Sequence, residues 1–173
     1  MYPHYTEYVR DWIPVPGSSK ERLINSALDL FSARGYEAVS VQDIAERAGV
    51  TTGSLYHHFG GKPQLHALVR TDVERRVADR VEAVLESDGS IDAALLTGFD
   101  WLVRSGFAGL IGAGSADTPS EGELDRVVAN AVGEHRALVA LAAWRAALTG
   151  AASSPAAAPL LRSALAELIA PRD

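Results

Sequence analysis

Cysteine is absent from this 173-residue chain, which excludes disulfides, thiolate catalysis and zinc sites that use sulfur. No uninterrupted apolar run approaches the roughly 20 residues that a transmembrane helix needs. The first residues also lack the basic stretch and apolar run of a secretory signal. Together these absences predict a cytoplasmic protein.

Positive charge is scarce, since 16 Lys and Arg residues stand against 22 Asp and Glu, for a formal net charge of −6. This balance argues against binding nucleic acid through a broad positive field. The deficit is uneven, because residues 1–64 hold six bases and seven acids, a net −1, whereas the remainder carries −5. If the nearly neutral N-terminal part binds nucleic acid at all, it must use a few placed contacts and helix N-termini.

Helical periodicity dominates the chain and no strand pattern is visible, which predicts an all-α fold. We expect an N-terminal extension over residues 1–17, a small N-terminal helical domain over 18–64 and a C-terminal helical body over 65–173. Tyr5, Tyr8, Val9 and Trp12 of the extension fall at helical spacing. A docked helix and a mobile arm both remain open for it.

Two short helices joined through a glycine form the centre of the N-terminal domain. The first helix of this domain begins at Ser18 or Ser19 and ends near Gly35. The next begins at Ser40 and stops at Gly49, and only two residues separate it from a third helix that ends near Phe59. This spacing predicts a helix-turn-helix motif.

A helix-turn-helix places its second helix, the one after Gly49, in the major groove of DNA. The first residues of that helix, Thr51 to Ser54, would meet base edges or backbone, and Tyr56 and His57 project from it. The preceding helix would direct its N-terminus, Ser40 to Gln42, at a phosphate. Lys62, at the start of the following long helix, favours a phosphate contact as well.

The segment Ala33–Lys62 closely resembles the DNA-binding domain of TetR-family repressors. The most diagnostic pieces are Phe31…Gly35-Tyr36, Ile44-Ala45…Ala48-Gly49-Val50 and Gly53…Leu55-Tyr56-His57-His58-Phe59…Lys62…Leu65. The resemblance runs from about Lys20 to Leu68, under a third of the chain. It implies DNA contacts at the matching positions, which with Ser54 give the predicted set Gln42, Thr51, Thr52, Gly53, Ser54, Tyr56, His57, His58 and Lys62.

This recognition helix departs from the usual chemistry in one respect. No Arg or Lys lies between Val50 and Phe59, so the common bidentate contact from Arg or Lys to guanine is unavailable there. Hydroxyl, aromatic and imidazole groups must carry the specificity. His57 and His58 cannot share a metal, because adjacent helix positions diverge by about 100°, and we predict no metal and no cofactor.

The body is predicted as further helices. A long helix runs from Pro63 to about Ser87, and a strongly apolar one covers residues 91–104. The stretch 105–120 contains at most a short helix. Residues 121–148 form one long helix or two that break at Gly133, and a loop over 150–155 precedes a last helix over 156–169.

The resemblance also implies that the body houses a small-molecule pocket and that its last two helices form a homodimer. The apolar faces around 139–148 and 160–169 are the predicted interface. The candidate ligand-binding residues are the aromatic and polar side chains of the apolar stretches, namely Phe99, Trp101, Arg104, Phe107, His135 and Trp144. Because the body is short for this family, we expect its pocket to be small, open or missing.

Scattered histidines and the absence of convergent catalytic groups argue against an enzyme. The sequence thus predicts a transcriptional repressor that binds a palindromic DNA operator and is released by a small-molecule effector. The alternative is a dimeric DNA-binding regulator without such an effector, which is regulated by a protein partner or works as an activator.

Overall fold

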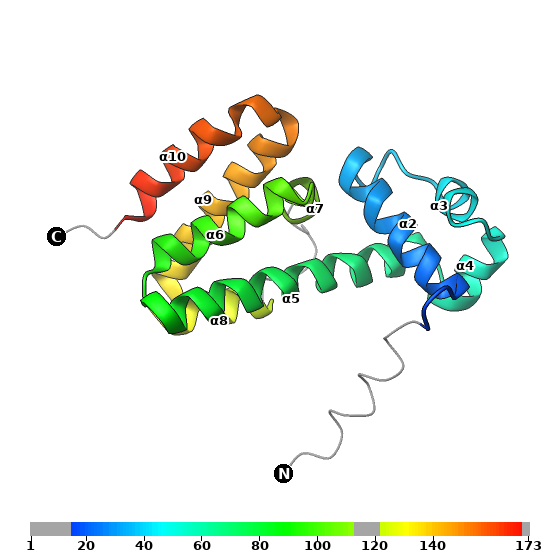
Figure 1. Cartoon of the computed structure of the whole chain (residues 1–173), viewed down its shortest axis with the longest axis horizontal. Coiled ribbons are helices and arrows are strands. Elements are labelled where there is room, and N and C mark those ends of the chain that lie inside the picture. Colours follow the sequence, from blue (N-terminus) through cyan, green and yellow to red (C-terminus); the bar gives the residue numbers. More distant parts are fainter. Residues whose placement is uncertain (1–14, 113–121, 171–173) are drawn as a thin grey trace, which may run out of the picture. The chain divides into compact units, whose positions relative to one another are not determined.

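The computed structural model describes residues 15–112 and 122–170, and every regular element in these ranges is a helix (Figure 1). The predicted all-α fold is therefore confirmed. The chain divides into two compact units, Met1–Val69 and Arg70–Asp173, and the boundary falls inside helix α5 (Lys62–Asp88). Most of the predicted N-terminal extension, including the helical spacing of its aromatic residues, lies outside the described residues.

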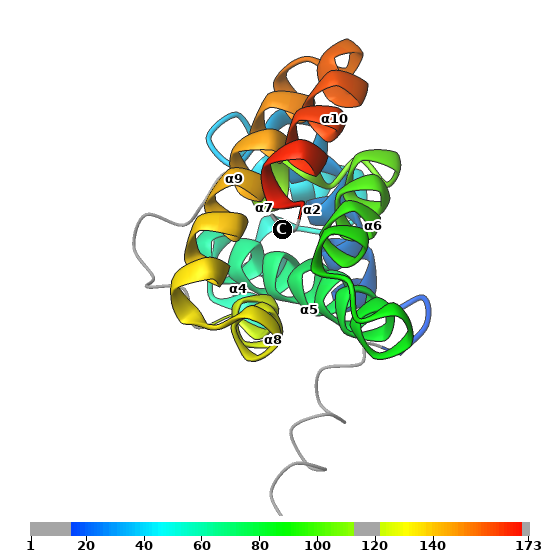
Figure 2. The same ribbon diagram turned by 90° about the vertical axis from the view of Figure 1, so that its left-hand side faces the viewer.

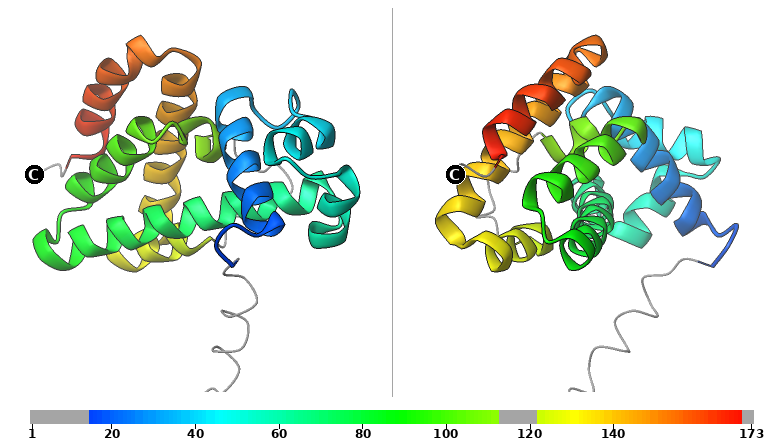
Figure 3. Two further views of the ribbon diagram at one scale, coloured as in Figure 1. Left: turned by 45° about the vertical axis from the view of Figure 1, so that its right-hand side comes forward. Right: turned by 60° about the vertical axis from the view of Figure 1, so that its left-hand side comes forward.

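The first unit packs three short helices against one another, α2 (Ser19–Arg34), α3 (Val41–Ala48) and α4 (Thr52–Phe59) (Figure 3). Helix α2 begins as predicted, because the Ser18 hydroxyl accepts a hydrogen bond from the Glu21 amide at 3.2 Å. It ends as predicted at Gly35, whose φ of 76° lies in the region that favours glycine. The inner face of α2 consists of Leu23, Ser26, Ala27, Leu30 and Phe31.

The turn between α3 and α4 has the predicted helix-turn-helix form. Gly49 is left-handed, with φ 64° and ψ 40°, and the following Val50 amide donates to the Ala45 carbonyl at 3.0 Å. No other atom lies within 4 Å of the position that a Cβ at Gly49 would take. Backbone conformation, and not crowding, is thus what calls for glycine here. Thr51 then caps α4 by accepting from the Ser54 amide at 3.2 Å.

The second unit is a bundle around one long helix, α9 (Glu134–Ser153). This helix packs against α6 (Ile91–Arg104), α7 (Ala108–Gly112), α8 (Glu123–Val132) and α10 (Ala158–Ile169). Figure 2 shows α9 and α10 side by side, joined by the 3₁₀ turn Pro155–Ala157.

Trp144 of α9 is the largest fully buried side chain of this bundle. Its indole Nε1 donates to the Leu95 carbonyl of α6 at 2.8 Å, so its single polar atom is satisfied inside the core. Gly98 of α6 allows a close approach, because a Cβ there would lie 3.0 Å from Val77 Cγ2 and 3.4 Å from Trp144 Cζ2. The body thus fills its centre with its own side chains.

Two expectations for the body are settled by the structure. The segment 121–148 forms two helices, because Gly133 adopts a φ of 84° and interrupts the chain between α8 and α9. The prediction of a loop over Gly150–Pro155 is wrong, since α9 continues to Ser153. Gly150 serves close packing instead, as a Cβ there would lie 2.9 Å from Leu161 Cδ1 of α10.

Within the described residues, none of the helices has the length and apolar character needed to cross a membrane.

Candidate nucleic-acid interface

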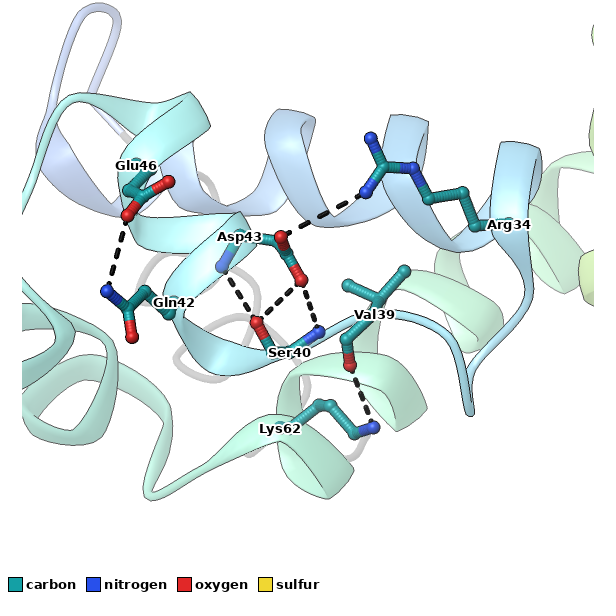
Figure 4. Close-up of polar contacts among 7 residues, drawn as sticks. All are labelled: Arg34, Val39, Ser40, Gln42, Asp43, Glu46 and Lys62. Atoms are coloured by element: carbon teal, nitrogen blue, oxygen red, sulfur yellow. Dashed lines mark hydrogen bonds and ion pairs between the residues drawn. The ribbon is translucent and has the colours of Figure 1, made fainter.

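The N-terminus of α3 is held by a complete capping box (Figure 4). The Asp43 amide donates to Ser40 Oγ at 3.0 Å, and the Ser40 amide donates back to Asp43 Oδ2 at 2.8 Å. The Ser40 hydroxyl donates to the same carboxylate oxygen at 2.5 Å. These bonds, with Arg34 4.0 Å away, lower the pKa of Asp43 below its usual value. The backbone amides of Ser40 and Asp43 at the start of α3 are therefore both bonded to side chains of the capping box.

Two arginines connect α3 with α2. Arg22 of α2 donates through Nε to the Ala48 carbonyl at 3.0 Å, at the end of α3. Arg47 of α3 donates to Asp29 of α2 at 2.8 Å. Both bonds connect residues distant in sequence, so the sequence periodicity alone did not indicate them. The part-buried Arg22 bond orients α3, and with it the exposed Gln42, relative to α2, whereas the exposed pair of Arg47 and Asp29 contributes little.

Gln42 lies on the exposed face of α3, where its Nε2 donates to Glu46 Oε1 at 3.3 Å (Figure 4). The Gln-to-Glu spacing of four residues is the usual one for side-chain pairs on a helix face, so the sequence did carry this signal. The pair presents a polar amide close to the capped N-terminus of α3.

Helix α4 separates its inward and outward side chains cleanly. Leu55 is fully buried, whereas the next residue, Tyr56, is 56 % exposed. Five other predicted DNA-contact residues in or next to this helix are exposed, namely Thr51, Thr52, Gly53, His57 and His58. Ser54 is half-buried. Most of the predicted contacts therefore lie exposed along α4, while Phe59 is half-buried.

The imidazole rings of His57 and His58 lie with their centroids 5.2 Å apart. In the part of the chain that the structure describes, no group of three His, Cys, Asp or Glu side chains is arranged to hold a metal ion. Both histidine side chains are exposed on α4.

Lys62 has partners that the sequence did not indicate. Its Nζ donates to the Tyr36 carbonyl at 3.0 Å and to the Val39 carbonyl at 2.9 Å. The same Nζ lies 4.0 Å from the centroid of the Tyr36 ring. The half-buried lysine therefore joins the start of α5 to the loop that leads into α3 (Figure 4).

The six candidate ligand residues of the body fall into separate places. Phe99 and Trp144 lie in the core, with 1 % and 0 % exposure. Trp101 and Phe107 lie together, with ring centroids 5.9 Å apart, and the Arg80 guanidinium covers the Trp101 ring at 4.1 Å.

The remaining two candidates are polar and exposed. Arg104 donates through Nε to the Asp100 carbonyl at 3.1 Å, one turn back on its own helix. His135 lies in the first turn of α9. The structure therefore brings together one aromatic pair of the predicted ligand set and leaves these two polar residues at the surface.

Comparison with known proteins agrees with this geometry. Residues 23–68 match the family described as bacterial regulatory proteins, tetR family. Over 72 residues the chain is 38 % identical to the HTH-type transcriptional repressor KstR2 of Mycolicibacterium smegmatis, an alignment that covers 42 % of this chain and 35 % of that protein. The chain thus spans about a third of this relative's length.

Solved structures share the fold over most of the chain. A transcriptional regulator from Rhodococcus sp. Rha1 is 25 % identical, with a TM-score of 0.68 that covers 88 % of this chain and 94 % of that one. The regulator FadR of Bacillus subtilis, solved in complex with stearoyl-CoA, is 15 % identical, with a TM-score of 0.64 over 86 % and 96 % of the two chains.

The fold and the exposed second helix of the motif together define an N-terminal helix-turn-helix domain. Residues 23–68 of this domain match the tetR family of bacterial regulatory proteins, and the fold of most of the chain is similar to that of a solved transcriptional regulator.

Proposed function

We propose that this chain is a sequence-specific transcriptional repressor that binds an operator in double-stranded DNA as a homodimer and leaves it when a small-molecule effector binds. The observation that carries the DNA-binding part is the arrangement of α4, which buries Leu55 and exposes Tyr56 beside it. The proposal assigns residues 1–17 to an extension, 18–64 to DNA binding and 65–173 to regulation and dimerisation. It places the protein in the cytoplasm, where a bacterial operator lies.

The proposed contacts divide by chemistry. The exposed hydroxyls and backbone of Thr51, Thr52 and Gly53, with Ser54 behind them, suit base edges and phosphates at the N-terminus of α4. Tyr56, His57 and His58 add an aromatic ring and two imidazoles farther along the helix. On α3, Gln42 and the capped N-terminus suit a phosphate. Because the described recognition helix carries no Arg or Lys, the sequence-dependent shape of the duplex contributes to specificity.

Exposed apolar side chains on α9 and α10 support the homodimer. Leu138 and Val139 of α9 are 70 % and 66 % exposed, and Leu160 and Leu168 of α10 are 75 % and 55 % exposed. Large exposed apolar side chains are typical of an interaction surface, and a second copy of the chain would cover them with two-fold symmetry. Leu165 is 3 % exposed inside its own body and does not belong to this surface.

Selection of bound sequences from random duplex DNA by the full chain tests the DNA-binding part. We expect an inverted repeat whose half-sites are centred about 10 base pairs apart, or a multiple of that, because a two-fold dimer presents two recognition helices to successive major grooves. If no sequence is enriched over the starting pool, or if light scattering gives a monomer, the proposal fails.

The effector is supported by the fold, since a structural neighbour, FadR of Bacillus subtilis, was solved with stearoyl-CoA. A thermal-shift screen of metabolites and acyl compounds identifies a ligand of the folded chain, because such a ligand raises the melting temperature. Calorimetry of that ligand with and without operator duplex follows. An effector that releases DNA must bind more weakly when operator is present, by the same factor.

A second function, a dimeric DNA-binding regulator without a small-molecule effector, is favoured by one observation. Phe99 and Trp144 fill the core of the body, and the Trp144 indole already donates to the Leu95 carbonyl. A ligand among these residues would have to displace packed side chains. Equal ligand affinities with and without operator, or no ligand in the screen, support this second function, in which a protein partner or an activating role replaces the effector.

A further inference from the structure

Lys62 holds a turn that belongs to another part of the DNA-binding unit. The turn covers residues 36–39, where the Val39 amide donates to the Tyr36 carbonyl at 3.4 Å. Lys62 Nζ donates to both carbonyls that flank this turn, at 3.0 Å to Tyr36 and 2.9 Å to Val39. Bonds from a charged donor are about twice as strong as neutral ones. The ammonium is therefore a clamp that closes the turn from outside.

The aromatic ring of Tyr36 reinforces the clamp. It lies 4.0 Å from Lys62 Nζ, and its centroid lies 4.7 Å from that of His66, one turn farther along α5. The His66 ring in turn meets the buried Phe31 ring edge-on, with centroids 4.9 Å apart. Two positions on one face of α5 thus hold the same tyrosine against α2.

The clamped turn leads directly into α3. Val39 is 1 % exposed, and the next residue, Ser40, is the N-cap of α3 and half of its capping box. The carbonyl that Lys62 binds is thus that of the residue immediately before the cap. Any movement of this turn carries Ser40, and with it the N-terminus of α3 and Gln42, which the proposed function directs at DNA.

The same geometry commits most of the donors of the ammonium to the protein itself. An ammonium has three N–H groups, and two of them are directed at the Tyr36 and Val39 carbonyls. The side chain is also half-buried between the turn and the tyrosine ring. The third N–H is left for an outside acceptor such as a phosphate, so a DNA contact by Lys62 does not require it to release the turn.

We propose that Lys62 is a positioning residue for operator binding, which acts through the 36–39 turn on the N-terminus of α3. The inference rests on the proposed function, because it assumes an operator. The clamp itself is a property of the free chain, so it can be measured without DNA.

The test compares three substitutions in the full-length protein. Lys62→Met keeps an apolar stem and removes every donor, and Lys62→Arg keeps the charge and can donate to both carbonyls. Arg47→Gln is the matched control, since it removes one positive charge from the same unit but only the exposed pair with Asp29. Lys62→Gln, which keeps a shorter donor, replaces Lys62→Met if circular dichroism shows that the latter does not fold.

Two measurements are made on each variant at a temperature where all are folded. The first is affinity for the selected operator duplex across a series of salt concentrations. The second is amide hydrogen exchange of residues 39–43 in the free protein, which reports on the turn and the capping box directly.

For Lys62→Met we expect operator affinity to fall about tenfold, or about 1.4 kcal/mol, and this loss to persist at high salt, where a phosphate contact contributes least. Exchange at residues 39–43 should become faster, Lys62→Arg should recover most of both effects, and Arg47→Gln should leave the exchange unchanged. A merely structural role would lower the melting temperature without changing the affinity of folded protein.

A salt slope smaller by about 0.9 for each bound copy, with exchange unchanged, would identify Lys62 as a phosphate ligand and overturn the inference. Unchanged affinity in Lys62→Met would overturn it as well. If the wild-type chain selects no operator, the proposed function fails, and unchanged exchange in the free variant would then refute the clamp separately.

Discussion

Two glycines of the five-residue helix α7 should respond in opposite directions to the same substitution. A Cβ at Gly112 would lie 2.6 Å from the backbone nitrogen of Thr149 and 2.8 Å from its Oγ1. Thr149 lies inside α9, so its nitrogen cannot move unless α9 moves. A Cβ at Gly109 would meet only the Ala152 Cβ at 3.4 Å, an ordinary contact.

The magnitudes follow from these contacts. Overpacking a core costs typically about 1–3 kcal/mol, and a clash with backbone belongs at the upper end, so we expect Gly112→Ala to lower the free energy of unfolding by about 3 kcal/mol. Gly109→Ala removes backbone freedom from the unfolded chain and should be neutral or stabilising by up to about 1 kcal/mol. The pair should therefore differ by about 3–4 kcal/mol, a large part of a stability of about 5–15 kcal/mol.

Urea denaturation of the two full-length variants, followed by circular dichroism and tryptophan fluorescence, measures this difference. With a slope of about 1–3 kcal/mol per molar urea, the midpoints should differ by about 1 M or more, with Gly112→Ala the lower. Equal midpoints, or a Gly112→Ala variant as stable as the wild type, would refute the close packing of α7 on α9.

Three further predictions concern the candidate interface and the assembly. Leu55→Ala should lower the free energy of unfolding by about 2–5 kcal/mol, whereas Tyr56→Ala should change it by less than about 0.5 kcal/mol. Tyr56→Ala should instead weaken operator binding in a gel-shift titration. Similar operator affinity for Tyr56→Ala and wild type would contradict the assignment of Tyr56 as a DNA contact. Since the Ser40 hydroxyl holds the pKa of Asp43 below its usual value of 3.8, the capping box should stabilise the protein fully above that pH and less as the pH falls through the lowered pKa. The stability difference between wild type and Asp43→Asn in urea should therefore shrink in acid, and a difference that grows would be contrary evidence. Leu168→Lys, on a 55 % exposed side chain, should halve the mass seen by light scattering with helical content retained, and an unchanged dimer would exclude this face.

The N-terminal domain was predictable because its signals are local. The caps at Ser18, Ser40 and Thr51 each use a bond within three residues, and Gly49 ends α3 by its own backbone conformation. The clean division between Leu55 and Tyr56 also follows from helical periodicity. These features depend on short stretches of chain, so the sequence alone contained them.

The body was less predictable because the roles of its glycines and aromatic residues depend on contacts with residues far away in the sequence. Gly150 reads as a loop residue in sequence, but the contact with Leu161 of α10 makes it a packing residue inside α9. In the sequence, Trp144 lies beside polar residues and was predicted as a ligand contact. In the structure it lies in the core, where its indole N–H donates to the Leu95 carbonyl of another helix. The bonds of Lys62 are of the same kind, since they span 23 and 26 residues.

The most direct test of the central claim, sequence-specific DNA binding by α3 and α4, is the ratio of two affinities. The wild-type chain is titrated against its selected operator duplex and against a shuffled duplex of the same composition, at one physiological salt concentration. We expect the operator to bind at least about 10³-fold more tightly, as specific protein–DNA complexes do. A ratio near one would contradict the claim, because a chain that binds both duplexes equally does not read sequence.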